Sequence, residues 1–135
     1  MKVNAIKTHY DQAVKELKAG NLDEADLICR QVLPQSGQNL NIICLLGEIC
    51  LKARKPQEAE NWFRKALRKH QDFPRALEGM GLSLLADGRS RKAVEVLTRA
   101  ASVLPKRSVT RVALARALAE TGHLAESDRV LKEAH

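Results

Sequence analysis

Aromatic side chains are scarce in this sequence, and their scarcity limits what its positive charge can mean. Tyrosine, tryptophan and phenylalanine make up 3% of the 135 residues, whereas 23 lysines and arginines give a formal net charge of +7. Proteins that read nucleic acids usually place aromatic or glycine-rich contacts beside such charge. Here Trp62 and Phe63 instead fall at the spacing of a helix core. The composition therefore argues against nucleic-acid binding and leaves a weak attraction to acidic partners.

The densest basic run has a simple explanation. Arg64, Lys65, Arg68 and Lys69 are expected on the outward face of a helix, where charges in the last turn complement the helix dipole. We interpret them as a solvated face.

Cysteine is also rare, which bears on redox compartment and metal binding. Cys29, Cys44 and Cys50 cannot all pair with one another, and this favours a reduced, cytoplasmic chain. The cysteines are separated by 15 and 6 residues, without a Cys-x-x-Cys, and the histidines form no close pair, so we predict no metal site. Cys29 and Cys50 fall at core positions, whereas Cys44 falls on the other side of its helix and is expected to be accessible.

Sequence signals for membranes, secretion and catalysis are missing as well. No apolar run approaches the ~20 residues that cross a membrane, and the start MKVNAIKTHYDQAV has no signal-peptide core. The glycines in Gly79-Met80-Gly81 fall inside an expected helix, so they do not form a phosphate loop. No nucleophile with a nearby base is readable. We predict a chain that is not an enzyme and uses no cofactor.

Two amphipathic helices are clear between residues 74 and 106. Apolar or small residues at i, i+3, i+4, i+7 and i+8 define the first stripe, Leu77, Met80, Gly81, Leu84 and Leu85, and similar spacing defines the second, Ala93, Val96, Leu97, Ala100, Ala101 and Leu104. Between them, Gly88 can take the left-handed conformation that ends a helix, and Ser90 can cap the next. The unit is a helical hairpin, which cannot bury both of its faces alone.

The same pattern recurs every 34 residues. Small residues recur in one register column, Ala13, Gly47, Gly81 and Ala115, and turn residues in another, Gly20, Arg54, Gly88 and Gly122. Ala93 aligns with Ala25, Ala59 and Ser127, and Leu97 aligns with Cys29, Phe63 and Leu131. Four copies in register indicate a stack of hairpins.

This register resembles the tetratricopeptide repeat (TPR) family, whose pattern is met by Gly81, Gly88, Ala93, Leu97 and Ala100. The resemblance implies an all-α, TPR-type α-solenoid of about four helix-turn-helix hairpins in a right-handed superhelix. We expect a single array with repeats at residues 6–39, 40–73, 74–107 and 108–135. It also implies a protein-protein interaction scaffold that holds a peptide or protein segment, with no role in a membrane.

In the family, the first helices of the hairpins line a concave groove through their second, fifth, ninth and twelfth positions. The register carries these positions onto a candidate peptide-binding groove that comprises Lys7, Tyr10, Val14, Asn41, Cys44, Glu48, Arg75, Glu78, Leu82, Val112 and Arg116, with Leu17, Leu51, Leu85, Val109 and Ala119 at the remaining positions.

Two interpretations of the groove remain open. In one, Asn41 bonds a peptide backbone, Arg75 and Arg116 meet acidic groups of the ligand, and apolar members such as Val112 accept its side chains. In the other, the charged members merely solvate the groove. Of the positions that grip a terminal carboxylate in TPR co-chaperones, only Arg75 fits, so that subtype is not expected.

The end of the sequence and one short stretch suggest further alternatives. Val130, Leu131 and Ala134 continue an apolar stripe with no polar closing helix after it. We therefore expect a fragment of a longer chain, or self-association through the uncapped C-terminal hairpin. Residues 24–33 resemble the first repeat of bacterial sulfotransferases with TPR arrays. The alternative function is thus an N-terminal recruiting or assembly array of such an enzyme, or of a glycosyltransferase, whose catalytic domain is absent here.

Overall fold

The protein is built of helices packed one after another. The computed structural model describes residues 3–133, and over this range it contains eight α-helices, one 3-10 helix and no strand. The elements are α1 (Val3–Lys18), α2 (Leu22–Val32), η1 (Pro34–Ser36), α3 (Leu40–Lys52), α4 (Pro56–Lys69), α5 (Pro74–Ala86), α6 (Ser90–Val103), α7 (Ser108–Glu120) and α8 (Leu124–Glu133). The predicted all-α solenoid is confirmed.

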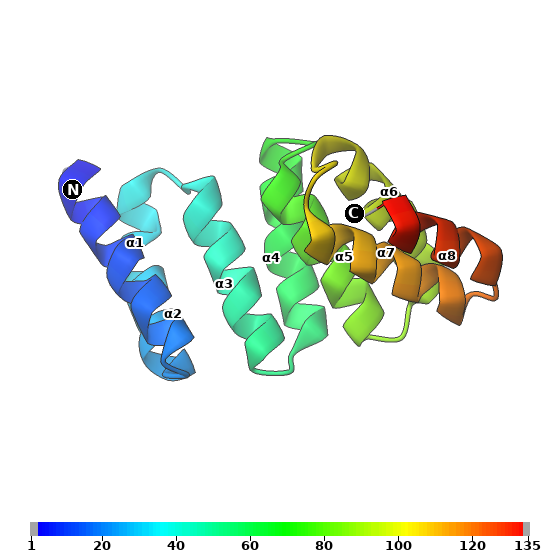
Figure 1. The fold of residues 1–135 in the computed structure, drawn as a ribbon. Coiled ribbons are helices and arrows are strands. Elements are labelled where there is room, and N and C mark those ends of the chain that lie inside the picture. The colour runs from blue at the N-terminus through cyan, green and yellow to red at the C-terminus, as the bar shows by residue number, and fades with distance from the viewer. Residues whose placement is uncertain (1–2, 134–135) are drawn as a thin grey trace.

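Consecutive helices pair as hairpins, α1 with α2 through α7 with α8, and each hairpin packs on the one before it (Figure 1). The first helices of neighbouring hairpins also touch one another, α1 with α3, α3 with α5 and α5 with α7. Within the described range the second helices make no such contacts. The stack therefore curves with α1, α3, α5 and α7 on its inner side.

The hairpin turns show why the register contains glycine. Gly20, Gly88 and Gly122 follow the first helices with φ between 77° and 87°, the left-handed region that favours glycine. Arg54 occupies the same place in the second hairpin with φ 62°. The prediction that Ser90 caps α6 is wrong. Arg89 is the N-cap residue of α6, and the Ser90 hydroxyl instead donates to Glu120 of α7.

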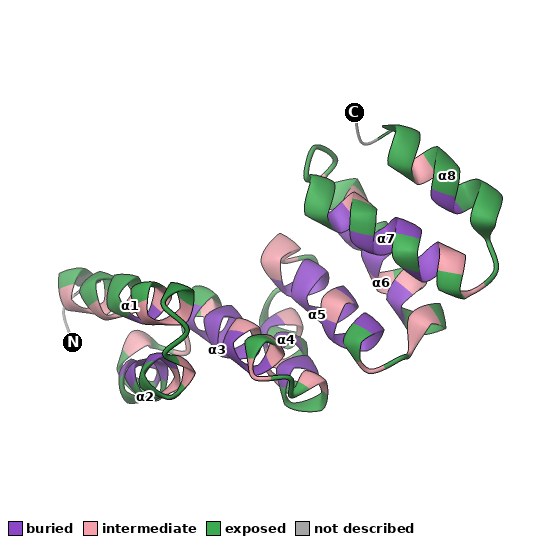
Figure 2. Ribbon diagram, turned by 60° about the horizontal axis from the view of Figure 1, so that its bottom comes forward, coloured by how far each residue is buried: buried purple, intermediate pink, exposed green. Residues whose placement is uncertain are grey.

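One aromatic ring fills the centre of the stack. Phe63 of α4 is completely buried, and it lies against Gly47 of α3 and Gly79 of α5. A Cβ built on Gly47 would lie 2.6 Å from the ring, and one built on Gly79 would overlap it. Since α3, α4 and α5 belong to two hairpins, the ring and the two glycines fix how these hairpins approach each other. Figure 2 shows that α3 and α5 are largely buried, whereas α8 is mostly exposed.

Adding a methyl group at Gly79 should therefore disturb the packing between these two hairpins. We expect Gly79→Ala to lower the free energy of unfolding by about 1–2 kcal/mol, since overpacking costs about 1–3 kcal/mol and alanine's helix propensity returns part of it. Urea denaturation measures the change. In a Phe63→Leu background the same substitution should cost little, and an equal loss in both backgrounds would show that the ring is not what excludes a side chain.

The second hairpin turn offers a stabilising substitution. Arg54→Gly should raise the free energy of unfolding by about 0.5–1 kcal/mol, because it removes left-handed strain while adding some entropy to the unfolded chain. The matched reverse change is Gly88→Arg, where a Cβ would meet nothing within 4 Å, so that only the backbone conformation is tested. It should destabilise in urea denaturation. A neutral or destabilising Arg54→Gly would contradict the assignment of strain to this turn.

Candidate interaction groove

The predicted groove residues come from the four first helices, α1, α3, α5 and α7, but they differ in accessibility. Lys7, Asn41, Val112 and Arg116 are exposed. The half-buried members are Tyr10, Val14, Glu48, Arg75 and Leu82, and the buried members are Cys44 and Glu78.

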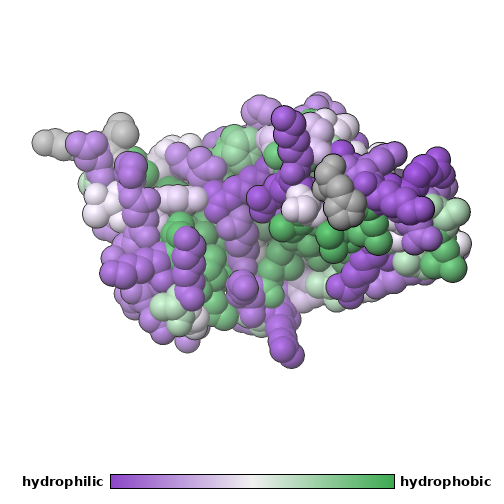
Figure 3. Space-filling view, in the orientation of Figure 1, coloured by the Kyte–Doolittle hydropathy of each residue, from purple (hydrophilic) through white to green (hydrophobic). Residues whose placement is uncertain are grey.

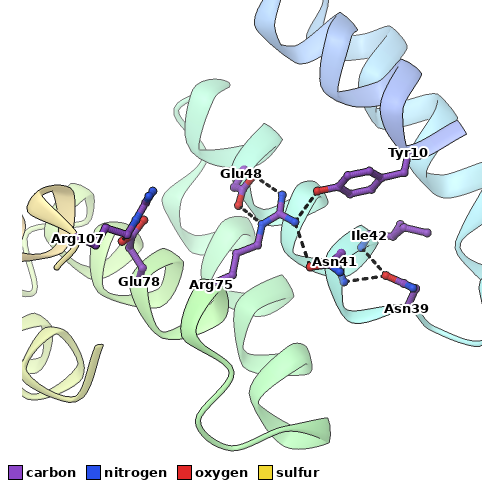
Figure 4. Close-up of polar contacts among 8 residues, drawn as sticks. All are labelled: Tyr10, Asn39, Asn41, Ile42, Glu48, Arg75, Glu78 and Arg107. Carbon is purple, nitrogen blue, oxygen red and sulfur yellow. Dashed lines mark hydrogen bonds and ion pairs between the residues drawn. The ribbon is translucent and has the colours of Figure 1, made fainter. Parts of the chain in front are cut away.

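Arg75 is the centre of a polar cluster that joins three hairpins. Its guanidinium donates to both carboxylate oxygens of Glu48, at 2.6 and 2.8 Å. It also donates to the Tyr10 hydroxyl at 2.6 Å and to the Asn41 side-chain oxygen at 3.3 Å (Figure 4). We call these four residues the Arg75 cluster. They come from α1, α3 and α5, so residues up to 65 positions apart hold the first helices together.

The electrostatics of the cluster keep Arg75 charged. Burial alone would lower the pKa of the guanidinium, but the hydrogen bond and the Coulomb attraction to Glu48, helped by Tyr10, raise its pKa above the ordinary value. The carboxylate that Arg75 meets is thus one of this chain. The expectation that Arg75 meets an acidic group of a ligand stays a prediction, and such a group would compete with Glu48 for the guanidinium.

A second carboxylate links α5 to the start of α7. Glu78 is buried and accepts hydrogen bonds from Arg107 at 2.6 Å and from the Thr110 hydroxyl. Figure 4 shows Glu78 and Arg107 pointing toward each other, apart from the Arg75 cluster. The hydrogen bond to Glu78 raises the pKa of Arg107. Both carboxylates border a hollow of about 550 Å³, whose lining also includes Phe73, Pro74 and Leu104.

A second hollow, of about 380 Å³, is apolar. It lies between α5 and α7 and is lined by Leu82, Leu85, Ser108, Val109, Val112, Ala113 and Arg116. We call it the apolar hollow. Val109 and Val112 keep 48% and 54% of their surface exposed, and both line this one hollow. Figure 3 shows an apolar area over α5 and α7, framed by hydrophilic side chains.

The repeat register explains why this hollow exists. Glu48 and Arg75 pair between α3 and α5, and the residues 34 positions later are Leu82 and Val109. Where the second and third hairpins are joined by an ion pair, the third and fourth therefore present two aliphatic side chains. These cannot bridge the space as the long charged side chains do. At these register positions the concave face is therefore polar at α3–α5 and apolar at α5–α7, although Glu78, Arg107 and Thr110 also join α5 to the start of α7.

Cys44 does not belong to the accessible surface, and the expectation that it is reachable is wrong. Its side chain is fully buried, as are the neighbouring positions from Ile42 to Gly47 of α3. α3 packs against α1, α2, α4 and α5, so nearly all of its circumference is covered. Burial raises the pKa of Cys44 to about 12, and the pKa of Cys29 is likewise raised to about 12 by burial, with a smaller effect from Asp26.

These thiols should be inert in the folded protein. At pH 8, Cys29 and Cys44 should react with a disulfide reagent only after unfolding in urea, because the reactive species is the thiolate. Since their folded pKa exceeds the unfolded value of about 8.5, they favour the folded state below that pH. Stability should then fall as the pH rises from about 9 toward 12. Labelling of either thiol in the native protein at pH 8, read by mass spectrometry, would contradict the burial.

The last hairpin is partly uncovered. Leu131 of α8 is 41% exposed, whereas Cys29, Phe63 and Leu97 at the same register position are buried. Val130 is half-buried, and Ala134 lies outside the described residues. The exposure of Leu131 is compatible with the expected covering by a second copy, which stays a prediction.

Sequence reasoning missed two members of the site. Arg107 and Thr110, which hold Glu78, lie in and just after the loop between α6 and α7, at positions that the groove register does not include. No periodic signal marks them. Val109, in contrast, could be predicted as a groove residue, because it occupies the second position of the fourth repeat.

Among residues 3–133, no group of three or more His, Cys, Asp or Glu side chains could hold a metal ion. Nor does any helix in this range have the length and apolar character that spanning a bilayer requires.

Fold and groove together define a helical-repeat solenoid, a class that presents an extended concave surface to other molecules. A family model described as tetratricopeptide repeat matches residues 10–81, which is more than half of the 135-residue chain. The chain belongs to the tetratricopeptide repeat family. No curated protein matches it.

Solved structures share the fold at low identity. TTC0263, a thermophilic TPR protein in Thermus thermophilus, superposes with a TM-score of 0.84 at 16% identity, over 96% of this chain and 72% of that one. MamA superposes with a TM-score of 0.83 at 17% identity, over 96% and 75% of the two chains. For MamA MSR-1 the values are 0.75 and 17%, over 99% and 78%. At such identity the likeness establishes the fold alone.

Proposed function

We propose that this protein is an interaction scaffold that binds a segment of another protein on its concave face, with the apolar hollow between α5 and α7 as the principal contact. Membership in the tetratricopeptide repeat family supports the scaffold role in general. The observation that supports the location is the pair of half-exposed valines, Val109 and Val112, beside Leu82 in one hollow.

The hollow has the properties of a binding site for a side chain. Its lining is mostly aliphatic and belongs to two packed helices, so the walls are largely preformed and little ordering is needed on binding. The volume of about 380 Å³ accommodates one large apolar side chain and part of its backbone. Filling it would cover surface that now faces water, at about 25 cal/mol per Å².

The other end of the concave face supports binding less well. In the Arg75 cluster, Arg75 already donates to Glu48, Tyr10 and Asn41, and a ligand carboxylate would have to displace Glu48. Breaking such a partly buried pair leaves a charge without its partner, which costs more than the pair contributes. Asn41 remains exposed, although its side-chain oxygen already accepts a hydrogen bond from Arg75.

The test is a selection of random dodecamer peptides, displayed on phage, against the immobilised protein. The selection should enrich peptides that bind Val112→Gln about fourfold more weakly, as measured by fluorescence anisotropy. Full burial of a valine contributes about 1.5 kcal/mol, and about half of the Val112 surface remains to be buried on binding. The uncharged replacement adds no new partner for Arg116. The matched control is Val103→Gln, at another exposed valine on α6, which should leave affinity unchanged.

Two results would contradict the proposal. One is a selection that enriches no peptide above background. The other is a set of peptides that lose as much affinity with Val103→Gln as with Val112→Gln, or that are unaffected by either substitution.

A further inference from the structure

We infer that the segment bound in the apolar hollow carries a carboxylate close to its aliphatic side chain, and that Arg116 binds this carboxylate. The inference rests on the proposed function and specifies the chemistry of its ligand. It assigns to Arg116 a role that the other two arginines near the groove are not placed to fill.

The arginines of the concave face differ in how they are engaged. Arg75 and Arg107 each hold a carboxylate of a neighbouring first helix, Glu48 and Glu78, and these pairs join hairpins to one another. Arg116 instead donates to Glu120 at 3.1 Å, one turn further along its own helix. The Arg116 side chain is 66% exposed. An exposed pair of this kind contributes only about 0.3–0.5 kcal/mol, so exchange of its partner costs little.

The register shows where the Arg116 side chain can reach. Arg116 lies 68 residues, or two repeats, after Glu48, at the same position of its first helix. Glu48 uses this position to pair with a charged group on the element packed next along the groove, Arg75 of α5. At α7 the position has the opposite charge. Because Arg116 also lines the apolar hollow, a segment bound there would meet a cation beside α7 and should supply a carboxylate.

The spacing of the two contacts can be estimated. Val112 and Arg116 are four residues apart on α7, so they lie on one face about 6 Å from each other along the helix axis. An extended peptide advances about 3.3 Å per residue. The carboxylate should thus lie about two residues from the aliphatic side chain. This combination also suits the overall charge of the protein, which is +7.

The peptides selected above provide the probe. Aspartate or glutamate should be enriched about two positions from a leucine, isoleucine or valine. In one synthetic peptide, replacement of the acid by its amide should weaken binding to the unaltered protein about three- to tenfold. The same replacement should have no effect on binding to Arg116→Gln. Arg68→Gln, at an exposed arginine of α4, is the control for charge alone and should keep the full effect.

The outcomes separate this inference from the proposed function. If peptides depend on Val112 but show no acidic enrichment, the inference is overturned and the function stands. The inference is likewise overturned, and the function stands, if replacing the acid by its amide weakens binding to Arg116→Gln as much as binding to the unaltered protein. If no Val112-dependent peptide is obtained, both are overturned.

Discussion

The contact of the Phe63 ring with two glycines is the constraint on which the rest of the structure depends. The ring comes from α4 and occupies the space that side chains at Gly47 and Gly79 would need, so α3 and α5 can pack closely around it. That approach brings Glu48 of α3 and Arg75 of α5 within hydrogen-bonding distance. In the next hairpin Leu97 takes the place of Phe63 and lies against Gly81, so the size of the two partners is matched again. The geometry of the concave face follows from this matching.

The two ends of the concave face differ because the same register positions hold different side chains. At α3–α5 an ion pair, supported by Tyr10, spans the helices and makes the surface polar. At α5–α7 two aliphatic residues, Leu82 and Val109, leave a hollow. A charged pair is specific and costly to break, whereas an apolar hollow gains by being filled. Under the proposed function the α3–α5 junction serves stability alone, whereas the α5–α7 junction, held by Glu78 with Arg107 and Thr110, also serves recognition.

Much of the fold could be predicted from the sequence, because a 34-residue period specifies helices, turns and small core positions together. The sequence also shows that Arg54 stands where the other three hairpin turns have glycine, although it does not show that Arg54 adopts the left-handed conformation. The accessibility of Cys44 was predicted wrongly, since the register gives the face of a helix but not that α3 is covered on nearly every side. The partnership of Arg75 with Tyr10, 65 residues away, leaves no periodic trace. From residue types alone, an arginine that pairs with a carboxylate of its own chain cannot be distinguished from one that binds a ligand.

The central claim is that recognition takes place between α5 and α7, and methyl NMR tests it most directly. The protein, labelled at leucine and valine methyl groups, would be titrated with a selected peptide. The account predicts that the methyl resonances of Leu82, Val109 and Val112 shift in a saturable manner while those of Leu27 and Val103, exposed on second helices, stay unchanged. Shifts confined to Leu27 or Val103 would place binding on the opposite side of the stack and contradict the account.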